Sequence, residues 1–200
     1  MVRIAIIADT HGQLDPRVAE LVSRCDLAVH GGDIGNAGVL RALQPRTGRV
    51  HAVIGNNDVP HKWPEDERCL LATIPELARL ALPGGELVVV HGHRLPARGR
   101  HERLRRQHPQ ARAIVYGHSH RLVADRGANP WVLNPGAAGR ARTYGGPSCI
   151  LLEAGERDWN LSVHRFEPRA RRANRSSDRH PVALRRPAKS EIYANLRGKK

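Results

Sequence analysis

The sequence predicts an α/β fold in which two mixed β-sheets face each other and helices flank them. Two observations lead to this prediction. Residues 1–55 alternate short apolar segments with helical ones, which is typical of parallel strands joined by helices. From residue 77 onward, most segments are short and strand-like, separated by Gly, Pro and Asn. Two sheets packed face to face, with the helices outside, accommodate both halves of the chain.

The first half contains three predicted strands and two predicted helices. Val2–Ala8 is an apolar run with one Arg, as expected for a strand buried on both faces. Leu27–His30 and Arg49–Ile54 are the next two strands. Asp15–Cys25 predicts a helix, because it starts with Asp-Pro and places three apolar residues at helical spacing. Asn36–Leu43 predicts the second helix, which completes a strand–helix–strand–helix–strand unit.

The second half is mostly strand. Leu77–Leu82 and Glu86–Val90 flank Pro83-Gly84-Gly85, which predicts a hairpin. Gly99–Gln107 predicts a short Arg-rich helix. Five further strands are predicted at Arg112–Tyr116, Leu122–Asp125, Trp131–Leu133, Cys149–Leu152 and Trp159–Phe166.

Length and composition bound the kind of protein. The 200 residues suit one domain with a tail, which we place at 1–167 and 168–200. The chain has no apolar run long enough to span a membrane, and its start does not resemble a signal peptide. Three widely spaced Cys (25, 69 and 149) exclude a disulfide framework and are expected to be buried. We therefore expect a cytoplasmic protein with no membrane partner.

The chain is strongly basic, with 33 Lys and Arg against 19 Asp and Glu and a net charge of +14. Most of this excess lies in residues 168–200, which have almost no apolar periodicity and are expected to be disordered. This tail either contacts nucleic acid or is a solvated terminus without a partner. No feature of the sequence predicts an oligomeric state.

Metal-capable side chains follow five of the predicted strands. Each strand ends in Asp, Asn or His beside Gly, in the blocks Asp9-Thr10-His11-Gly12, Gly31-Gly32-Asp33, Gly55-Asn56-Asn57-Asp58, His91-Gly92-His93 and Gly117-His118-Ser119-His120. On extended backbone, Asp9 and His11 point to one face, and so do His118 and His120. Carboxylate, imidazole and amide groups suit divalent ions such as Mn, Fe, Zn or Co. Two such ions that share a carboxylate can clamp a phosphoryl group.

The five blocks, taken in order, resemble the calcineurin-like metallophosphoesterases over roughly residues 1–167. They look most like the small phosphodiesterase subgroup of bacteria and archaea. The resemblance implies a dinuclear phosphodiesterase that attacks a small phosphoester with a metal-bridging hydroxide. Its cofactors would be two divalent metal ions, with Mn expected first and Fe, Zn, Co or Ni as alternatives.

The resemblance also implies a role for each residue of the blocks. Asp33 would bridge the two metal ions. The implied ligands of the first metal are Asp9, His11 and His120, and those of the second are Asn56, His91 and His118. Asn134-Pro135-Gly136 is similar to a loop of the family, in which Ser usually follows; here the next residue is Ala137.

The sequence departs from the family at Asn57, where a His or Cys is common. An amide can donate a hydrogen bond to a phosphate oxygen, but it cannot deliver a proton near neutral pH. Activity is therefore expected on esters with good leaving groups. His93 either contacts the substrate phosphate or is a loop residue bonded to backbone. Asp58 is expected to orient a ligand from outside the metal centre.

Three other functions stay open at this point. A phosphomonoesterase would use the same centre, and a nuclease-like enzyme would add the basic tail. A non-catalytic metal-binding scaffold would use the fold as an interaction surface.

The six Arg residues between 94 and 106 either hold an anionic substrate or form a solvated helix face.

Overall fold

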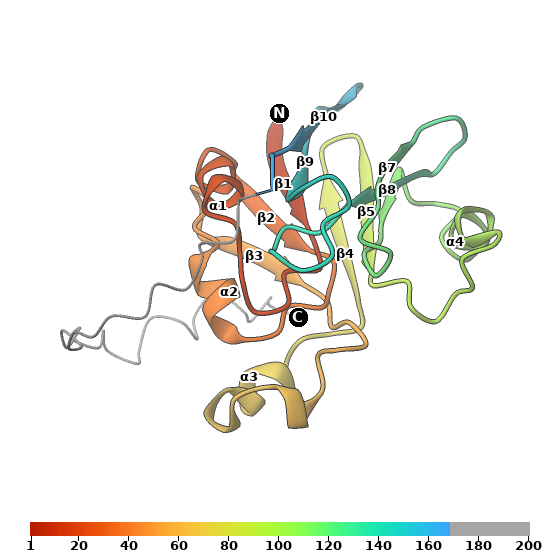
Figure 1. Ribbon diagram of the computed structural model, residues 1–200. Helices are drawn as coiled ribbons and strands as arrows, with labels where there is room; N and C mark the ends of the chain where they lie inside the picture. The colour runs from red at the N-terminus through yellow and green to blue at the C-terminus, as the bar shows by residue number, and fades with distance from the viewer. Residues whose placement is uncertain (169–200) are drawn as a thin grey trace. The chain divides into compact units, whose positions relative to one another are not determined.

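The first of two five-stranded sheets contains the N-terminal strand at its centre. The computed structural model describes residues 1–168 (Figure 1). The strand order is β10-β9-β1-β2-β3, with β1 parallel to β2, β2 parallel to β3, and β9 antiparallel to both β1 and β10. The strands span Val2–Ile7 (β1), Leu27–His30 (β2), Arg49–Ala52 (β3), Ser148–Ala154 (β9) and Trp159–Arg165 (β10).

The second sheet has the order β4-β5-β6-β8-β7. Strands β5, β6 and β8 are parallel, while β4 and β7 pair antiparallel at the edges. The strands span Leu77–Leu82 (β4), Gly85–Val90 (β5), Ala113–Val115 (β6), Leu122–Asp125 (β7) and Trp131–Pro135 (β8). The predicted pair of facing mixed sheets is thus confirmed, as is the hairpin.

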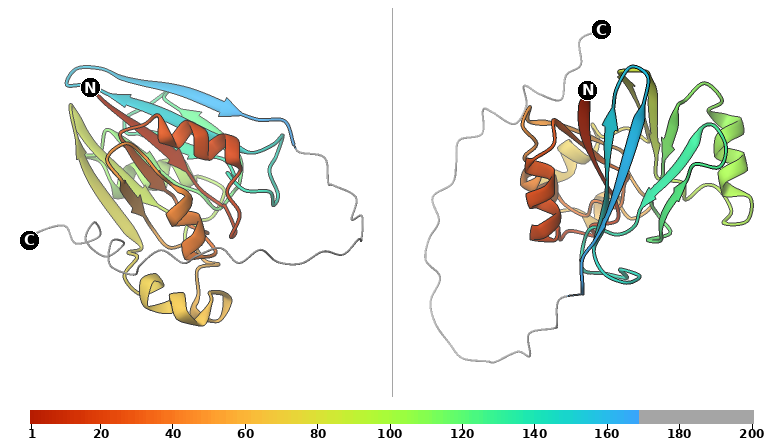
Figure 2. Two further views of the ribbon diagram at one scale, coloured as in Figure 1. Left: turned by 90° about the vertical axis from the view of Figure 1, so that its left-hand side faces the viewer. Right: turned by 90° about the horizontal axis from the view of Figure 1, so that it is seen from above.

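Helices cover the outer faces of the sheets. Figure 2 shows α1 (Pro16–Ser23) outside the first sheet and α4 (Arg100–Gln107) outside the second. Asp15 caps α1, as predicted, because its carboxylate accepts the backbone N–H of Arg17 at 2.9 Å. The second helix, α2 (Ala37–Ala42), lies beside α1 in the first layer.

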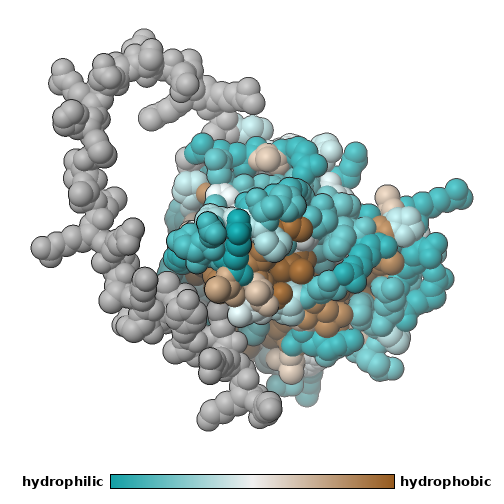
Figure 3. All heavy atoms as spheres, turned by 90° about the horizontal axis from the view of Figure 1, so that it is seen from below, coloured by the Kyte–Doolittle hydropathy of each residue, from teal (hydrophilic) through white to brown (hydrophobic). Residues whose placement is uncertain are grey.

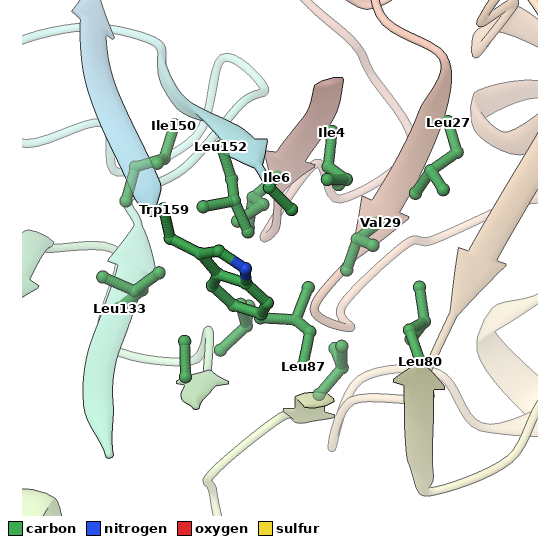
Figure 4. Close-up of a cluster of buried hydrophobic side chains, with 14 of the residues drawn as sticks. Ile4, Ile6, Leu27, Val29, Leu80, Leu87, Leu133, Ile150, Leu152 and Trp159 are labelled. Carbon is green, nitrogen blue, oxygen red and sulfur yellow. The ribbon is translucent and has the colours of Figure 1, made fainter. Parts of the chain in front are cut away.

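Apolar side chains from both sheets meet in the space between them (Figure 4). Along β1 the residues alternate. Ile4 and Ile6 point into this core, whereas Ala5 and Ile7 pack beneath α1. A strand with two buried faces must be apolar at every position, which explains the continuous run in the sequence. The other sheet contributes residues such as Leu87 to the same core.

One segment has structure that the sequence pattern did not predict. Two 3-10 turns, Pro60–Lys62 and Glu65–Glu67, lead into the short helix α3 (Arg68–Leu71). Turns of three or four residues have no measurable apolar period, so periodicity cannot detect them. Cys25 and Cys149 are buried as predicted, but the prediction for Cys69 was wrong. Its thiol is exposed because it lies on the solvent side of α3.

The outer surface is mainly hydrophilic, although hydrophobic side chains reach it near the middle of the face seen from below (Figure 3). No helix within residues 1–168 is long and apolar enough to cross a membrane.

The basic tail predicted at 168–200 lies outside the described residues except for Pro168. Its disorder and its nucleic-acid partner stay predictions.

Truncation of a core residue tests the account of the fold. Ile6 is fully buried between the sheets, so Ile6→Ala should lower the free energy of unfolding by about 3 kcal/mol through lost burial and a cavity. Val163 on β10 is 47% exposed, and Val163→Ala should cost less than about 1 kcal/mol. Urea unfolding measures both values. Equal losses in the two variants would contradict the assignment of this core.

Candidate metal centre

The loops that follow β1, β2, β3, β5 and β6 gather at one edge of the two sheets. In Figure 1 this is the lower edge, toward which β1 runs. Backbone hydrogen bonds join neighbouring loops: Asp9 N–H to the Gly32 carbonyl at 3.0 Å, and His11 N–H to the Asp33 carbonyl at 2.9 Å. Gly117 N–H donates to the His91 carbonyl at 3.2 Å in the second sheet. The predicted strand-end blocks are therefore brought together.

Four side chains form a first cluster. Ligand-capable atoms of Asp9, His11, Asp33 and His120 all lie within 4.8 Å of one another. His11 Nε2 is 3.1 Å from His120 Nε2. His120 Nε2 is 3.6 Å from Asp9 Oδ1. This set of two carboxylates and two imidazoles can hold a divalent cation.

Three more side chains form a second cluster on the other side of Asp33. Asn56 Oδ1 is 2.9 Å from His118 Nδ1 and 3.1 Å from His91 Nε2. His91 donates its other ring N–H to the Gly31 carbonyl at 2.8 Å, which leaves Nε2 to face the cluster. The group offers an amide oxygen and two imidazole nitrogens.

Asp33 lies between the two clusters and faces each with a different oxygen. Its Oδ2 is 3.8 Å from His11 Nε2, and its Oδ1 is 3.4 Å from His91 Nε2. Asp33 is 1% exposed. All seven residues predicted as ligands thus lie in two groups that meet at one carboxylate.

The backbone that presents these residues differs from the prediction. Extended backbone was expected for the Asp-x-His and His-x-His pairs, but these residues adopt left-handed conformations: φ is 54° at Asp9, 47° at His11, 65° at His118 and 56° at His120. The expected alternation was therefore wrong. The chain turns sharply as each strand ends, and the turns, at some cost in backbone strain, aim the side chains at the site.

Burial and charge prepare the first cluster for a cation. Burial raises the pKa of Asp9 to about 7, and its Oδ2 has no hydrogen-bond partner among the described residues. Burial, Arg142 and His11 lower the pKa of His120 to about 4, so the ring is neutral at pH 7. A buried carboxylate oxygen without a partner, beside neutral imidazoles, fits a divalent cation.

Asp33 is held as an anion. Burial alone would raise its pKa, but the hydrogen bond and charge of His91 and two hydrogen bonds from Asn57 lower it. Asn57 donates its backbone N–H to Oδ1 at 2.8 Å and its side-chain N–H to Oδ2 at 2.7 Å. Lys62 in turn donates to Asn57 Oδ1 at 2.6 Å. The structure thus places the Asn57 amide on Asp33, and its predicted bond to a substrate phosphate stays a prediction.

Asp58 braces the loop that carries Asp33. It is buried, and its carboxylate accepts backbone N–H groups from Ile34 at 3.0 Å, Gly35 at 2.9 Å and Gly55 at 2.8 Å, as well as Trp63 Nε1 at 3.1 Å. These contacts fix the loops after β2 and β3 against each other, and none of the hydrogen bonds of Asp58 within the described residues goes to a predicted ligand side chain.

Two polar residues support the centre from other sides. Asn134 is fully buried and donates to the Gly117 carbonyl at 2.8 Å and to Ser119 Oγ at 3.0 Å, which fixes the loop of His118 and His120. His30 is also fully buried and lies 2.9 Å from Thr10 Oγ1. These hydrogen bonds explain why two polar side chains are buried in the core. Neither residue needs a role in catalysis or metal binding to account for its position.

His93 lies beside the second cluster. Its ring centroid is 5.5 Å from that of His91 and 6.3 Å from that of His118. Its Nδ1 is buried and has no hydrogen-bond partner among the described residues. Burial, together with the charges of His91 and Arg94, lowers the pKa of His93, which keeps it neutral at pH 7. The structure thus places the ring beside the second cluster, and its contact with a substrate phosphate stays a prediction.

Three of the six Arg residues before and within α4 bind groups outside the metal centre. Arg94 pairs with Glu76 at 2.5 Å and Arg105 pairs with Asp125 at 2.8 Å. Arg100 donates to the Leu95 carbonyl at 2.9 Å. These contacts argue against the binding of an anionic substrate by these three Arg residues, and for the other three both interpretations stay predictions.

One Arg that the sequence analysis did not single out reaches the first cluster. Arg142 Nη2 is 3.3 Å from His11 Nε2 and 3.2 Å from His120 Nε2. Arg142 lies in the loop between β8 and β9, far from every metal block in the sequence. Only the folded chain shows this proximity.

A profile of the calcineurin-like phosphoesterase superfamily domain matches residues 2–157, which is most of the chain. The chain belongs to the calcineurin-like phosphoesterase superfamily. The predicted resemblance is thereby confirmed. A search of curated proteins finds no significant relative of this phosphoesterase.

Solved structures share the fold at low sequence identity. A Vps29 variant from Entamoeba histolytica has a TM-score of 0.63 and 18% identity, over 82% of this chain and 99% of its own. An archaeal phosphodiesterase has a TM-score of 0.60 and 21% identity, over 81% and 99%. A predicted phosphoesterase from Streptococcus pneumoniae has a TM-score of 0.57 and 20% identity, over 82% and 89%. The phosphoesterase fold therefore spans enzymes and Vps29 proteins.

Gly55 offers a test of the site that replaces none of its polar residues. A Cβ at Gly55 would lie 2.2 Å from Asp33 Oδ1 and 2.3 Å from the Asp33 backbone nitrogen, so Gly55→Ala must displace Asp33. We expect Mn²⁺ binding, measured by calorimetry, to weaken by about tenfold or more. Gly127→Ala is the control, since its Cβ would meet nothing closer than 3.7 Å. Unchanged affinity in Gly55→Ala would contradict a role for Asp33 in metal binding.

Proposed function

We propose that this phosphoesterase is a dinuclear metal-dependent phosphodiesterase that hydrolyses small phosphodiesters. The position of Asp33 is the observation on which the proposal depends. Its two oxygens face two separate clusters of ligand-capable atoms, and a carboxylate in that position can bridge two ions. A centre with a single ion would not need the second cluster.

The residues present fit two divalent ions. Asp9, His11 and His120 would hold the first together with Asp33. Asn56, His91 and His118 would hold the second together with the same carboxylate. Bound divalent ions neutralise charge on a phosphoryl group and lower the pKa of water, which is what phosphoester hydrolysis requires. Mn²⁺ is the first choice for this set of N and O donors, with Fe, Zn, Co and Ni as alternatives; a Vps29 structure from Entamoeba histolytica contains Zn²⁺.

The remaining side chains suggest which esters react. Asn57 is an amide bound to Asp33 and has no proton to give to a leaving group near pH 7. The lowered pKa of His93 makes its ring a hydrogen-bonding partner and a weak proton source at neutral pH. Esters whose leaving groups depart without protonation should therefore react best. The likeness to an archaeal phosphodiesterase supports diesters as the substrate class.

A non-catalytic scaffold is the second candidate, and the likeness to Vps29 proteins favours it. In that case the centre would bind metal without turnover. A phosphomonoesterase would differ only in its preferred ester. The same assay separates all three.

Hydrolysis of bis-p-nitrophenyl phosphate with added Mn²⁺ tests the proposal. Asp33→Asn keeps the size of the side chain but removes the bridging charge, and should lower kcat/KM by more than about 100-fold. Asp158→Asn, an exposed residue in the turn between β9 and β10, is the matched control and should keep wild-type activity.

The outcome decides among the candidates. If wild-type activity is no higher than that of Asp33→Asn with every divalent ion tried, the non-catalytic scaffold is the remaining candidate. A higher kcat/KM on p-nitrophenyl phosphate than on the diester would leave the phosphomonoesterase. The proposal expects the reverse preference.

A further inference from the structure

We infer that Arg142 binds the phosphoryl oxygens of the substrate at the first cluster and thereby couples anion binding to metal binding. This inference rests on the proposed function, because it concerns the same centre. It assigns a ligand-binding role to a residue outside all five metal blocks.

The guanidinium lies beside the atoms that would hold the first ion. Arg142 Nη2 is 3.3 Å from His11 Nε2 and 3.2 Å from His120 Nε2, and those two nitrogens are 3.1 Å apart. The side chain thus borders the first cluster on its open side.

The loop holds Arg142 in this place. At its start, Ala138 N–H donates to the Ala8 carbonyl at 2.9 Å, directly before the first metal block. Gly139 packs so closely that a Cβ there would lie 2.3 Å from the Thr10 carbonyl oxygen. Beyond Arg142, the Tyr144 ring stacks with the Arg121 guanidinium at 4.9 Å. Arg142 itself has a φ of 49°, a conformation that a non-Gly residue adopts only where its surroundings require it.

Arg142 also differs in its partners from the Arg residues before and within α4. Arg94 and Arg105 each pair with a carboxylate, whereas Arg142 has no ion pair within residues 1–168. Its hydrogen bonds go to two imidazole nitrogens, which are the atoms that a metal ion would take. A guanidinium without a carboxylate, at the entrance of a cation site, is available to an anionic ligand.

Electrostatics then connects the two binding events. His11 and His120 would give a divalent ion the lone pairs that Arg142 now meets, and the bound charge would lie next to the guanidinium. The two cations repel each other unless an anion lies between them. A phosphoryl group can neutralise both cations, because one oxygen can face the ion while the others accept hydrogen bonds from the guanidinium. The metal ion should therefore bind more tightly to the protein that holds the anion. The anion should bind more tightly, by the same factor, to the protein that holds the metal ion.

The test measures binding of Mn²⁺ to the full-length apoprotein by calorimetry, with and without inorganic phosphate. In the wild type, phosphate should lower the Kd of Mn²⁺ by about tenfold. Arg142→Gln should bind Mn²⁺ alone at least as tightly as the wild type, since a repulsive charge is removed. Its phosphate effect should fall below about twofold. Arg140→Gln, an exposed Arg of the same loop, is the matched control and should keep the wild-type phosphate effect.

The outcomes separate this inference from the function on which it rests. If the wild type binds Mn²⁺, Asp33→Asn loses that binding, and Arg142→Gln still shows the wild-type phosphate effect, the role of Arg142 is overturned and the metal centre stands. If the wild type binds no Mn²⁺, the role of Arg142 and the proposed metal centre are both overturned. Arg142→Lys keeps the charge and should keep a phosphate effect larger than that of Arg142→Gln. A Lys variant no different from the Gln variant would overturn a role for the charge.

Discussion

A buried carboxylate constrains the loops that form the candidate metal centre. Asp33 is 1% exposed, and an anion removed from water in this way requires compensation from every direction. Asn57 supplies two N–H groups, His91 supplies a ring, and Asp58 secures the surrounding backbone. The two divalent ions that we propose would complete this compensation. Neither sheet alone carries both clusters of donors. The clusters form where the strand ends of the two sheets meet, at Asp33.

The rigidity of the two sheets makes this convergence possible. Central strands such as β1 are apolar on both faces, so they are fixed between a helix and the opposite sheet. The loops after them can then hold five of the predicted ligand residues, Asp33 among them, in left-handed conformations that would be unfavourable in a free chain. Strain of this kind persists only where the surroundings determine the backbone. The site is therefore pre-formed by the fold, which suits either catalysis or tight metal binding.

Much of this was predictable because the relevant signals are local. Continuous apolar runs identified the strands, Asp15 and Pro16 identified the start of α1, and polar residues beside Gly marked the strand ends. Other features depend on tertiary contacts. The left-handed conformation of Asp9 and His11 follows from loop packing, and the approach of Arg142 follows from how a distant loop docks on β1. The contact of Asn57 with Asp33 likewise joins residues from different loops, so the residue type alone could not reveal it.

The central claim is that one carboxylate joins two metal ions, and a crystal structure of the protein grown with Mn²⁺ tests it most directly. Anomalous scattering locates each ion independently of the protein coordinates. Our account predicts two Mn²⁺ peaks about 3.5–4 Å apart, one on each side of Asp33, with His11 and His120 at one and His91 and His118 at the other. A single peak, or two peaks of which only one contacts Asp33, would contradict it.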